Sequence, residues 1–226
     1  MDKNKEKIMR LHVRRAMDNL IKNNYGVSYV PLKTDIVPLF SSLIEKGAVV
    51  GASGSVSLNE TGLIDFVKQF GCTFIDRFSP RLTKEELYEQ NMKHLHSDIY
   101  LASANAITER GEIYCVDGSN NRLAALLYGP KKVYIIVGHN KIVANVKDGV
   151  NRVKHLAAPA NATRLDRDTY CVTHGHCVAP FIDEKHLMSI PPHACDNGIC
   201  SSFLVLGRQA IKERIHVIIV GEDLGY

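Results

Sequence analysis

The sequence contains no tryptophan, few other aromatic residues and no apolar run long enough to cross a lipid bilayer. A membrane-spanning helix needs about 18 to 20 consecutive, predominantly apolar residues, so we do not expect the chain to enter a membrane. The opening stretch, MDKNKEKIMRLHVRR, is charged and amphipathic and lacks the apolar segment of a secretory signal. We therefore expect a cytoplasmic protein.

Concentrated positive charge is also missing. The net charge of +4 is spread along the chain, without a basic block and without aromatic residues interleaved among lysines and arginines. Nucleic-acid-binding proteins usually carry such a basic patch, so nucleic acid is not an expected partner. The chain has no flavin or NAD fingerprint either, so it is not expected to accept a hydride by itself.

What is present is the pattern of an α/β protein. The 226 residues are 45% hydrophobic, which is ample for a buried core, and strand-like and helix-like segments alternate, which favours a mostly parallel, Rossmann-like sheet. We expect one domain over residues 1–226, with a leading helix at about 2–24 and a cysteine-bearing excursion at about 168–200. The expected strands are 27–30, 48–50, 72–78, 98–107, 111–117 (a hairpin partner of the preceding one), 132–138, 203–209 and 214–222. The other expected helices are 34–46, one starting near 59, 83–93 with Thr83 as its N-cap, 120–128 and 145–157.

A glycine- and serine-rich turn follows the second expected strand, in VVGASGSVSLNETG at 49–62. Backbone N–H groups are unpaired where such a turn enters a helix, and they attract phosphate or carboxylate. The candidate ligand-binding residues are Ser53, Gly54, Ser55 and Ser57. The turn matches neither the Walker pattern nor G-x-G-x-x-G, so a plain tight turn is the alternative.

Further polar residues lie at the ends of the expected strands 98–107, 111–117 and 132–138 and in the turns that follow them. Open α/β sheets bind ligands outside the carboxyl ends of their strands, although ordinary turn chemistry explains many such residues. Asn105, Asn121 and Lys141 are the candidate substrate-binding residues of this group. Its candidate catalytic residues are Glu109, Arg122 and His139.

Four of the six cysteines form two loose pairs near the C-terminal end. Five residues separate Cys171 from Cys177, four separate Cys195 from Cys200, and seventeen lie between the pairs. In a reducing compartment clustered cysteines indicate metal or redox chemistry rather than disulfides. Four thiolates form a complete ligand set for zinc or for an iron–sulfur cluster, and the spacing does not decide between these cofactors. His174, His176, His186 and His193 are either alternative ligands or simply loop residues, and Cys72 and Cys115 are expected to be buried structural thiols.

Several segments together resemble one family. They are GSVSLNETG, FIDRF, SANAITERGEIYCVDGSNNRLAALLYGPKKVYIIVGHNKIV, AAPANATRL, CVTHGHC and VIIVGEDLGY. In this order they are similar to the LUD-domain, or lactate-utilisation, family over nearly the whole chain. The resemblance implies a Rossmann-like α/β fold similar to that of the ribose-5-phosphate isomerase, glucosamine-6-phosphate deaminase and CoA-transferase group. In that group the turn matching Gly51–Ser57 holds phosphate or carboxylate.

The resemblance also bears on the cysteines and on partners. Single-domain members show a segment of the type CxxTGxCxDC…IC, which Cys171, Gly175, Cys177 and Cys200 match, whereas Cys195 takes the third position only if residues 178–194 are an insertion. Family members contribute to the oxidation of L-lactate to pyruvate, usually beside subunits that carry iron–sulfur clusters. Such subunits, a small carboxylate or phosphate, and a second copy of the chain are the expected partners.

Three functions follow as hypotheses. In the first, the chain is a subunit or accessory of L-lactate oxidation, with a carboxylate on the 53–57 turn and Glu109, Arg122 or His139 handling a proton. In the second, it is an isomerase-like or transferase-like enzyme acting on a phosphorylated sugar or acyl group, with Glu60 or Glu109 as general base. In the third, it is a non-catalytic metal-binding partner module.

Overall fold

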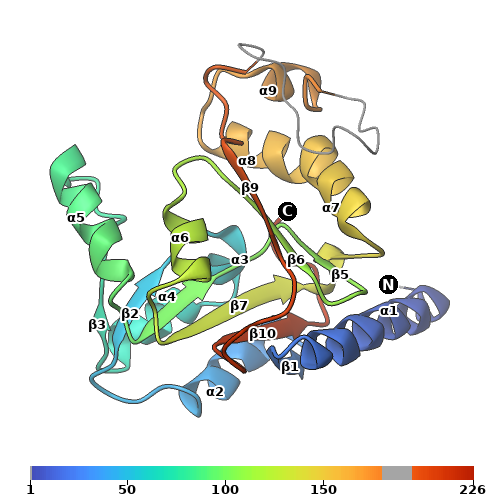
Figure 1. Ribbon diagram of the computed structural model, residues 1–226, viewed down its shortest axis with the longest axis horizontal. Coiled ribbons are helices and arrows are strands. Elements are labelled where there is room, and N and C mark those ends of the chain that lie inside the picture. The colour runs from blue at the N-terminus through green and yellow to red at the C-terminus, as the bar shows by residue number, and fades with distance from the viewer. Residues whose placement is uncertain (1, 180–194) are drawn as a thin grey trace.

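The structure is a computed structural model that describes residues 2–179 and 195–226, and its strands form two sheets (Figure 1). The six-stranded sheet is entirely parallel, in the order β1-β10-β7-β4-β2-β3. Its strands are β1 (Gly26–Val30), β2 (Val49–Ala52), β3 (Thr73–Phe74), β4 (Ile99–Ala102), β7 (Lys132–Gly138) and β10 (Ile215–Val220). The prediction of a Rossmann-like α/β fold is confirmed.

The central strands are buried on both faces, which explains their nearly continuous apolar sequences. In β7, Val133 and Val137 join the hydrophobic core on one face, and Tyr134 and Ile136 join the core on the other. The helices that complete these two cores differ. One core includes residues of α1 and α6, and the other includes residues of α2, α3 and α4.

Helices connect most of the strands along the chain. They are α1 (Lys3–Lys22), α2 (Ile36–Ser41) after a 3-10 turn η1 (Lys33–Asp35), α3 (Val56–Glu60), α4 (Leu63–Gln69), α5 (Lys84–His94), α6 (Asn121–Leu127), α7 (Val146–Arg152), α8 (Ala158–Arg164) and α9 (Tyr170–His174). A 3-10 turn η2 (His139–Lys141) follows β7, and a π-helical turn η3 (Val153–Ala157) joins α7 to α8. Helices α7, α8 and α9 form a layer above the smaller sheet (Figure 1).

The smaller sheet contains β8 (Ile142–Val143), β5 (Ala106–Thr108), β6 (Ile113–Asp117) and β9 (Ser202–Leu206), in that order. The prediction of one strand at 98–107 is wrong, because the chain leaves the parallel sheet after β4 and enters the smaller sheet as β5. Asn105 lies at this transition, and its side-chain oxygen accepts a hydrogen bond from Val116 N at 2.9 Å. The predicted hairpin is confirmed, since β5 and β6 pair antiparallel.

Helix boundaries show where local chemistry overrides periodicity. The capping box at Thr83 is confirmed, with hydrogen bonds in both directions between Thr83 and Glu86. The helix expected over 34–46 ends instead at Ser41, whose hydroxyl donates to Pro38 O at 2.7 Å. The helix expected to start near Asn59 is two helices, because Gly62 interrupts it with a left-handed φ of 67°.

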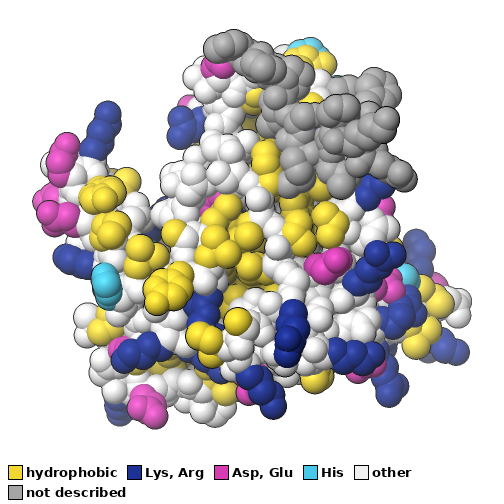
Figure 2. All heavy atoms as spheres, viewed as in Figure 1, with side chains coloured by type: hydrophobic (Ala, Val, Ile, Leu, Met, Phe, Trp, Pro, Cys, Tyr) yellow, Lys and Arg dark blue, Asp and Glu magenta, His cyan; other side chains and the backbone are white. Residues whose placement is uncertain are grey.

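Helix α5 carries exposed apolar side chains among its charged ones. Helix α5 projects from the sheet edge, and hydrophobic side chains are visible on it in Figure 2. They are Leu87, Tyr88 and Met92, all exposed. Among the helices within residues 2–179 and 195–226, none combines the length and the apolar character that crossing a bilayer requires.

Gly111 tests the packing of α1 against the β5–β6 turn. It has φ +79°, and a Cβ there would lie 2.5 Å from the backbone carbon of Asn19. Gly47 is a matched control, since its φ is +83° and nothing lies within 4 Å of the position that a Cβ would take. We expect Gly47→Ala to cost about 1 to 2 kcal/mol of unfolding free energy, and Gly111→Ala to cost about 1 to 3 kcal/mol more because α1 must shift. Urea denaturation measures both; equal costs would contradict this packing.

Candidate functional site

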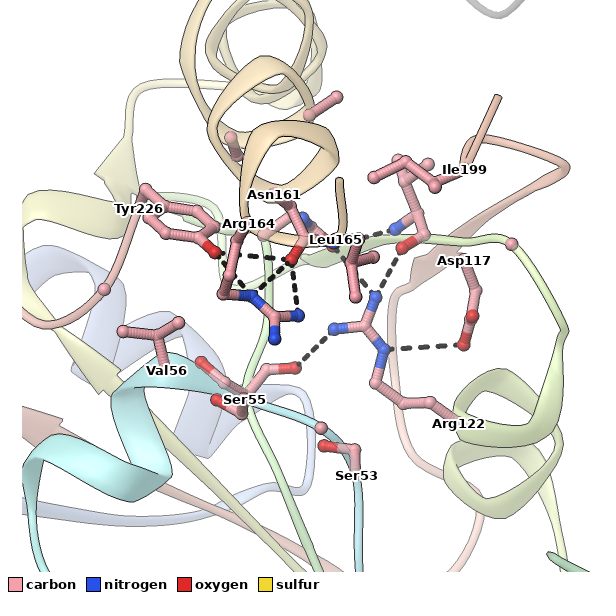
Figure 3. Close-up of a pocket in the computed structure, with 18 of the residues that line it drawn as sticks. Ser53, Ser55, Val56, Asp117, Arg122, Asn161, Arg164, Leu165, Ile199 and Tyr226 are labelled. Atoms are coloured by element: carbon pink, nitrogen blue, oxygen red, sulfur yellow. Dashed lines mark hydrogen bonds and ion pairs between the residues drawn. The ribbon is translucent and has the colours of Figure 1, made fainter. Parts of the chain in front are cut away.

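The carboxyl ends of β2, β4, β7 and β10 meet at one edge of the parallel sheet, as its register requires. Strand β2 is paired with β3 on one side and β4 on the other, so the chain reverses its winding direction there. Open α/β sheets bind ligands at such switch points. A cleft of about 380 Å³ lies at this edge, and Figure 3 shows part of its lining.

The cleft is strongly cationic. The positively charged residues that line it are Arg77, Arg122, Lys141, Arg164 and Arg167. Among the lining residues that the structure describes, Asp117 is the one acidic side chain. Walls of one charge sign raise the local concentration of oppositely charged ligands. The cleft therefore suits an anion, although the net charge of the whole chain is small.

The serine-rich turn forms one wall of the cleft, and its three hydroxyls have different surroundings. Ser55 caps α3 by accepting a hydrogen bond from Leu58 N at 3.4 Å. Ser57 is buried and contacts Lys141. The hydroxyl of Ser53 is buried and has no hydrogen-bond partner among the described residues. A buried hydroxyl without a partner is costly, so Ser53 Oγ, which lines the cleft beside Gly54 (Figure 3), is free for a ligand.

Lys141 supplies a buried amine at the cleft. Its Nζ donates to Ser57 Oγ at 2.9 Å and to Ser103 Oγ at 3.1 Å, and only 4% of the residue is exposed. Burial, together with the guanidinium groups of Arg152 and Arg122, lowers the pKa of Lys141 to about 7. The amine is therefore in part neutral at physiological pH, when it can accept a proton.

Arg122 lines the cleft but serves the architecture. Its guanidinium donates to Ser103 O at 3.1 Å, to Asn105 Oδ1 at 3.2 Å and to Val116 O, and it pairs with Asp117 (Figure 3). These bonds tie the chain after β4 to the end of β6. A guanidinium does not deprotonate in proteins. Arg122 is thus poorly suited to the proton transfer expected of it from the sequence.

The other two predicted catalytic residues, Glu109 and His139, do not line the cleft. The carboxylate of Glu109 accepts hydrogen bonds from Arg15 and His12 on α1, and these bonds lower its pKa. Glu109 therefore fixes α1 to the β5–β6 turn. His139 Nε2 lies 3.0 Å from an oxygen of Asp223 beside β10. Both residues follow strands, as predicted, but their side chains have structural partners.

The two predicted asparagines do line the cleft. Asn105 Oδ1 is already shared between Val116 N and Arg122. Asn121 Nδ2 donates to Asn91 Oδ1 at 3.1 Å. Both therefore shape the wall of the cleft through bonds to neighbouring protein groups.

Sequence reasoning missed the wall contributed by α8 and the C-terminal residues. Arg164 Nε donates to Asn161 Oδ1 at 3.1 Å and to Tyr226 Oη at 2.8 Å, which holds the guanidinium at the rim of the cleft (Figure 3). Arg77 was also missed; its Nε is buried without a hydrogen-bond partner in the described structure. Tyr226 follows β10, so the rule of strand ends, applied to the last strand, would have identified it.

The four predicted metal ligands come together. Cys171, Cys177, Cys195 and Cys200 all line one small cavity of about 30 Å³. Burial and the three other thiols raise the pKa of Cys200 to about 12. Within residues 2–179 and 195–226, no three His, Cys, Asp or Glu side chains are arranged to hold a metal ion. The four thiols thus line one cavity, but their arrangement is not that of a metal site.

Neither His174 nor His176 lines the cysteine cavity. The ring of His174 stacks on Tyr170, with centroids 3.9 Å apart, and His176 packs against the edge of the same tyrosine. His186 and His193 lie outside the described residues. Cys115 is buried as predicted, whereas Cys72 is half-buried.

The cysteine cavity and the cationic cleft are neighbours. Both are lined by Val153, Ala158, Gly198, Ile199 and Cys200. One thiol of the cluster therefore belongs to the wall of the cleft. A ligand in the cleft would therefore lie next to the cysteine cavity.

Comparisons with known proteins agree with this architecture. The LUD domain family matches residues 13–220. No curated protein matches the chain. The crystal structure of a DUF162 family protein from Deinococcus radiodurans superimposes with a TM-score of 0.52 at 14% sequence identity, covering 94% of this chain and 98% of that chain. At this identity the likeness shows the fold alone.

Replacing Lys141 by methionine tests the electrostatics of the site. Because the folded-state pKa of about 7 lies below the ordinary 10.5, the unfolded chain binds more protons between these values, and the free energy of unfolding of the wild type rises with pH there. We expect Lys141→Met to be more stable than the wild type by on the order of a few kcal/mol near pH 6. This advantage should shrink towards pH 10.

Urea denaturation at several pH values measures this difference. Lys7→Met, at an exposed position of α1, reports the effect of removing a lysine from the surface. A stability difference between Lys141→Met and wild type that does not change with pH would contradict the assignment of a buried, destabilising charge.

Proposed function

This chain belongs to the LUD-domain family, and from that premise we propose that it binds a small 2-hydroxy acid in the cationic cleft and acts as a subunit or accessory of L-lactate oxidation to pyruvate. Membership supports a function in lactate utilisation at the level of the family. The observation that carries the proposal is the cleft itself, with five cationic side chains and one acidic one among its described lining residues.

The described side chains suggest a division of roles. Arg164, already oriented by Asn161 and Tyr226, would pair with the carboxylate of the substrate. Ser53 Oγ would form a hydrogen bond with the same ligand. This bond would remove the free-energy cost of burying the hydroxyl without a partner. Lys141, when neutral, would accept the proton of the substrate hydroxyl at Nζ.

The oxidation releases two electrons and two protons, so an electron acceptor is needed. The chain shows no flavin or NAD fingerprint, and we assign the acceptor to partner subunits with iron–sulfur clusters. The alternative of an isomerase or transferase acting on a phosphorylated sugar or acyl group is less well supported. Its proposed bases, Glu60 and Glu109, do not line the cleft, and Glu60 accepts a hydrogen bond from Gly225 N at 2.8 Å.

We further propose that Cys171, Cys177, Cys195 and Cys200 hold a metal group. Four thiols lining one cavity form a donor set that suits zinc or an iron–sulfur cluster. A cluster would supply one-electron transfer beside the cleft, and zinc would supply a structural clamp.

Substrate binding is tested by Arg164→Gln. The side chain is exposed, so the fold should survive, while the loss of a charged hydrogen bond of about 1.5 to 3 kcal/mol should weaken L-lactate binding by about tenfold or more. The measurement is the rise in melting temperature with L-lactate concentration. The control is Arg10→Gln, at an arginine whose partner is Glu6 on the surface of α1. Equal stabilisation of Arg164→Gln and wild type by L-lactate would remove Arg164 from the site.

Metal binding is tested by elemental analysis of anaerobically purified protein. We expect one metal group per chain in the wild type and in Cys72→Ser, and its loss in Cys171→Ser and Cys200→Ser, together with a lower melting temperature. A brown protein identifies an iron–sulfur cluster, and a colourless protein with one zinc per chain identifies zinc. A metal-free wild type, or equal metal content in all four proteins, would contradict the proposal.

A further inference from the structure

We propose that Lys141 is a nucleophile, whose amine forms an imine with a small 2-oxo acid bound in the cleft. The inference rests on the proposed function for the class of ligand, because pyruvate is the product of L-lactate oxidation. It adds a covalent step to the proton-accepting role proposed for this amine. Its basis is the arrangement of hydroxyl and charged groups around the amine.

The amine has hydrogen-bond partners that leave its lone pair available. Lys141 Nζ donates to Ser57 Oγ and to Ser103 Oγ. These hydroxyls donate in turn to backbone carbonyls, Ser57 to Leu224 O at 3.3 Å and Ser103 to Ala104 O at 3.5 Å. A neutral amine has two N–H bonds and one lone pair. Each hydroxyl can thus accept from the amine and direct its own hydrogen to a carbonyl oxygen, an arrangement that leaves the lone pair of Nζ unused.

The same bonds argue against a serine nucleophile. A serine activated by lysine must direct its hydrogen towards the amine, whereas Ser57 and Ser103 accept from the amine and have Leu224 O and Ala104 O as acceptors for their own hydrogens. The amine is therefore the better placed nucleophile of the three groups. All three residues line the cleft.

The charges facing the amine favour its neutral form. After burial, which lowers its pKa most, Arg152 on α7 and Arg122 on α6 lower it further, while Cys115 on β6 and Glu60 on α3 raise it to a smaller extent. Among the described residues, the hydrogen-bond partners of Nζ are two neutral hydroxyls and no carboxylate. With a pKa of about 7, the neutral fraction at pH 7 exceeds that of an ordinary lysine by about a thousandfold.

The step balances without an oxidant or a reductant. Nζ attacks the carbonyl carbon of the 2-oxo acid, a C–N bond forms and the carbonyl oxygen becomes a hydroxyl. The carbinolamine then loses that hydroxyl with one proton from nitrogen, which gives the C=N bond and releases one water. Arg164 would hold the carboxylate during this sequence, and the serine hydroxyls lie within reach of the nitrogen proton.

The test is reductive trapping. Wild-type protein is incubated with pyruvate and sodium borohydride, digested, and mapped by mass spectrometry. We expect one modified lysine, Lys141, carrying one pyruvate as a secondary amine. The trapping rate should rise with pH to half its maximum near pH 7, following the pKa of Lys141. Lys141→Arg should lose the adduct, and Lys131→Arg, at an exposed lysine paired with Asp98, should retain it.

Binding of pyruvate, measured by thermal stabilisation of the same preparation, separates the two proposals. Stabilisation without an adduct on Lys141 overturns the imine while the carboxylate site stands. No stabilisation and no adduct overturns both. Adducts spread over exposed lysines, with none on Lys141, also overturn the imine, because they show only the ordinary reactivity of surface amines.

Discussion

The common direction of the six strands of the parallel sheet is the constraint on which the site depends. Because β2, β4, β7 and β10 all end at one edge, the segments that follow them must share that edge. Arg122 then holds the chain after β4 against the end of β6 through Ser103 O and Val116 O. The cleft is therefore a consequence of strand direction and of this guanidinium clamp. The side chains that line it come from segments that follow the strands, such as Ser53 and Lys141, and from α8, which supplies Arg164.

The cleft concentrates groups that are unfavourable without a ligand. Lys141 is a buried amine among guanidinium groups, Ser53 Oγ has no described partner and Arg77 Nε is buried and unpaired within the described residues. Each of these costs stability. An anion bound in the cleft could supply hydrogen-bond or charge partners for such groups.

Periodicity and caps in the sequence sufficed to predict the parallel sheet, the leading helix and the capping box at Thr83. They failed where backbone hydrogen bonding depends on distant partners. The split of residues 98–107 between two sheets depends on Asn105, whose amide oxygen accepts hydrogen bonds from Val116 and Arg122. Glu109 illustrates the same limit, because it follows a strand like a site residue while its partners lie on α1. The cysteines were found because thiols are rare and their grouping does not depend on strand register.

The cationic cleft and the cysteine cavity share a wall, so they lie side by side. We propose that the cleft recognises a small carboxylate by charge. Calorimetric titration of the wild type with L-lactate and with its neutral amide, lactamide, tests this directly. Recognition by charge predicts one L-lactate site per chain, weakened by added salt, and no measurable binding of lactamide. Equal binding of the two compounds, or no binding of L-lactate to the folded protein, would contradict it.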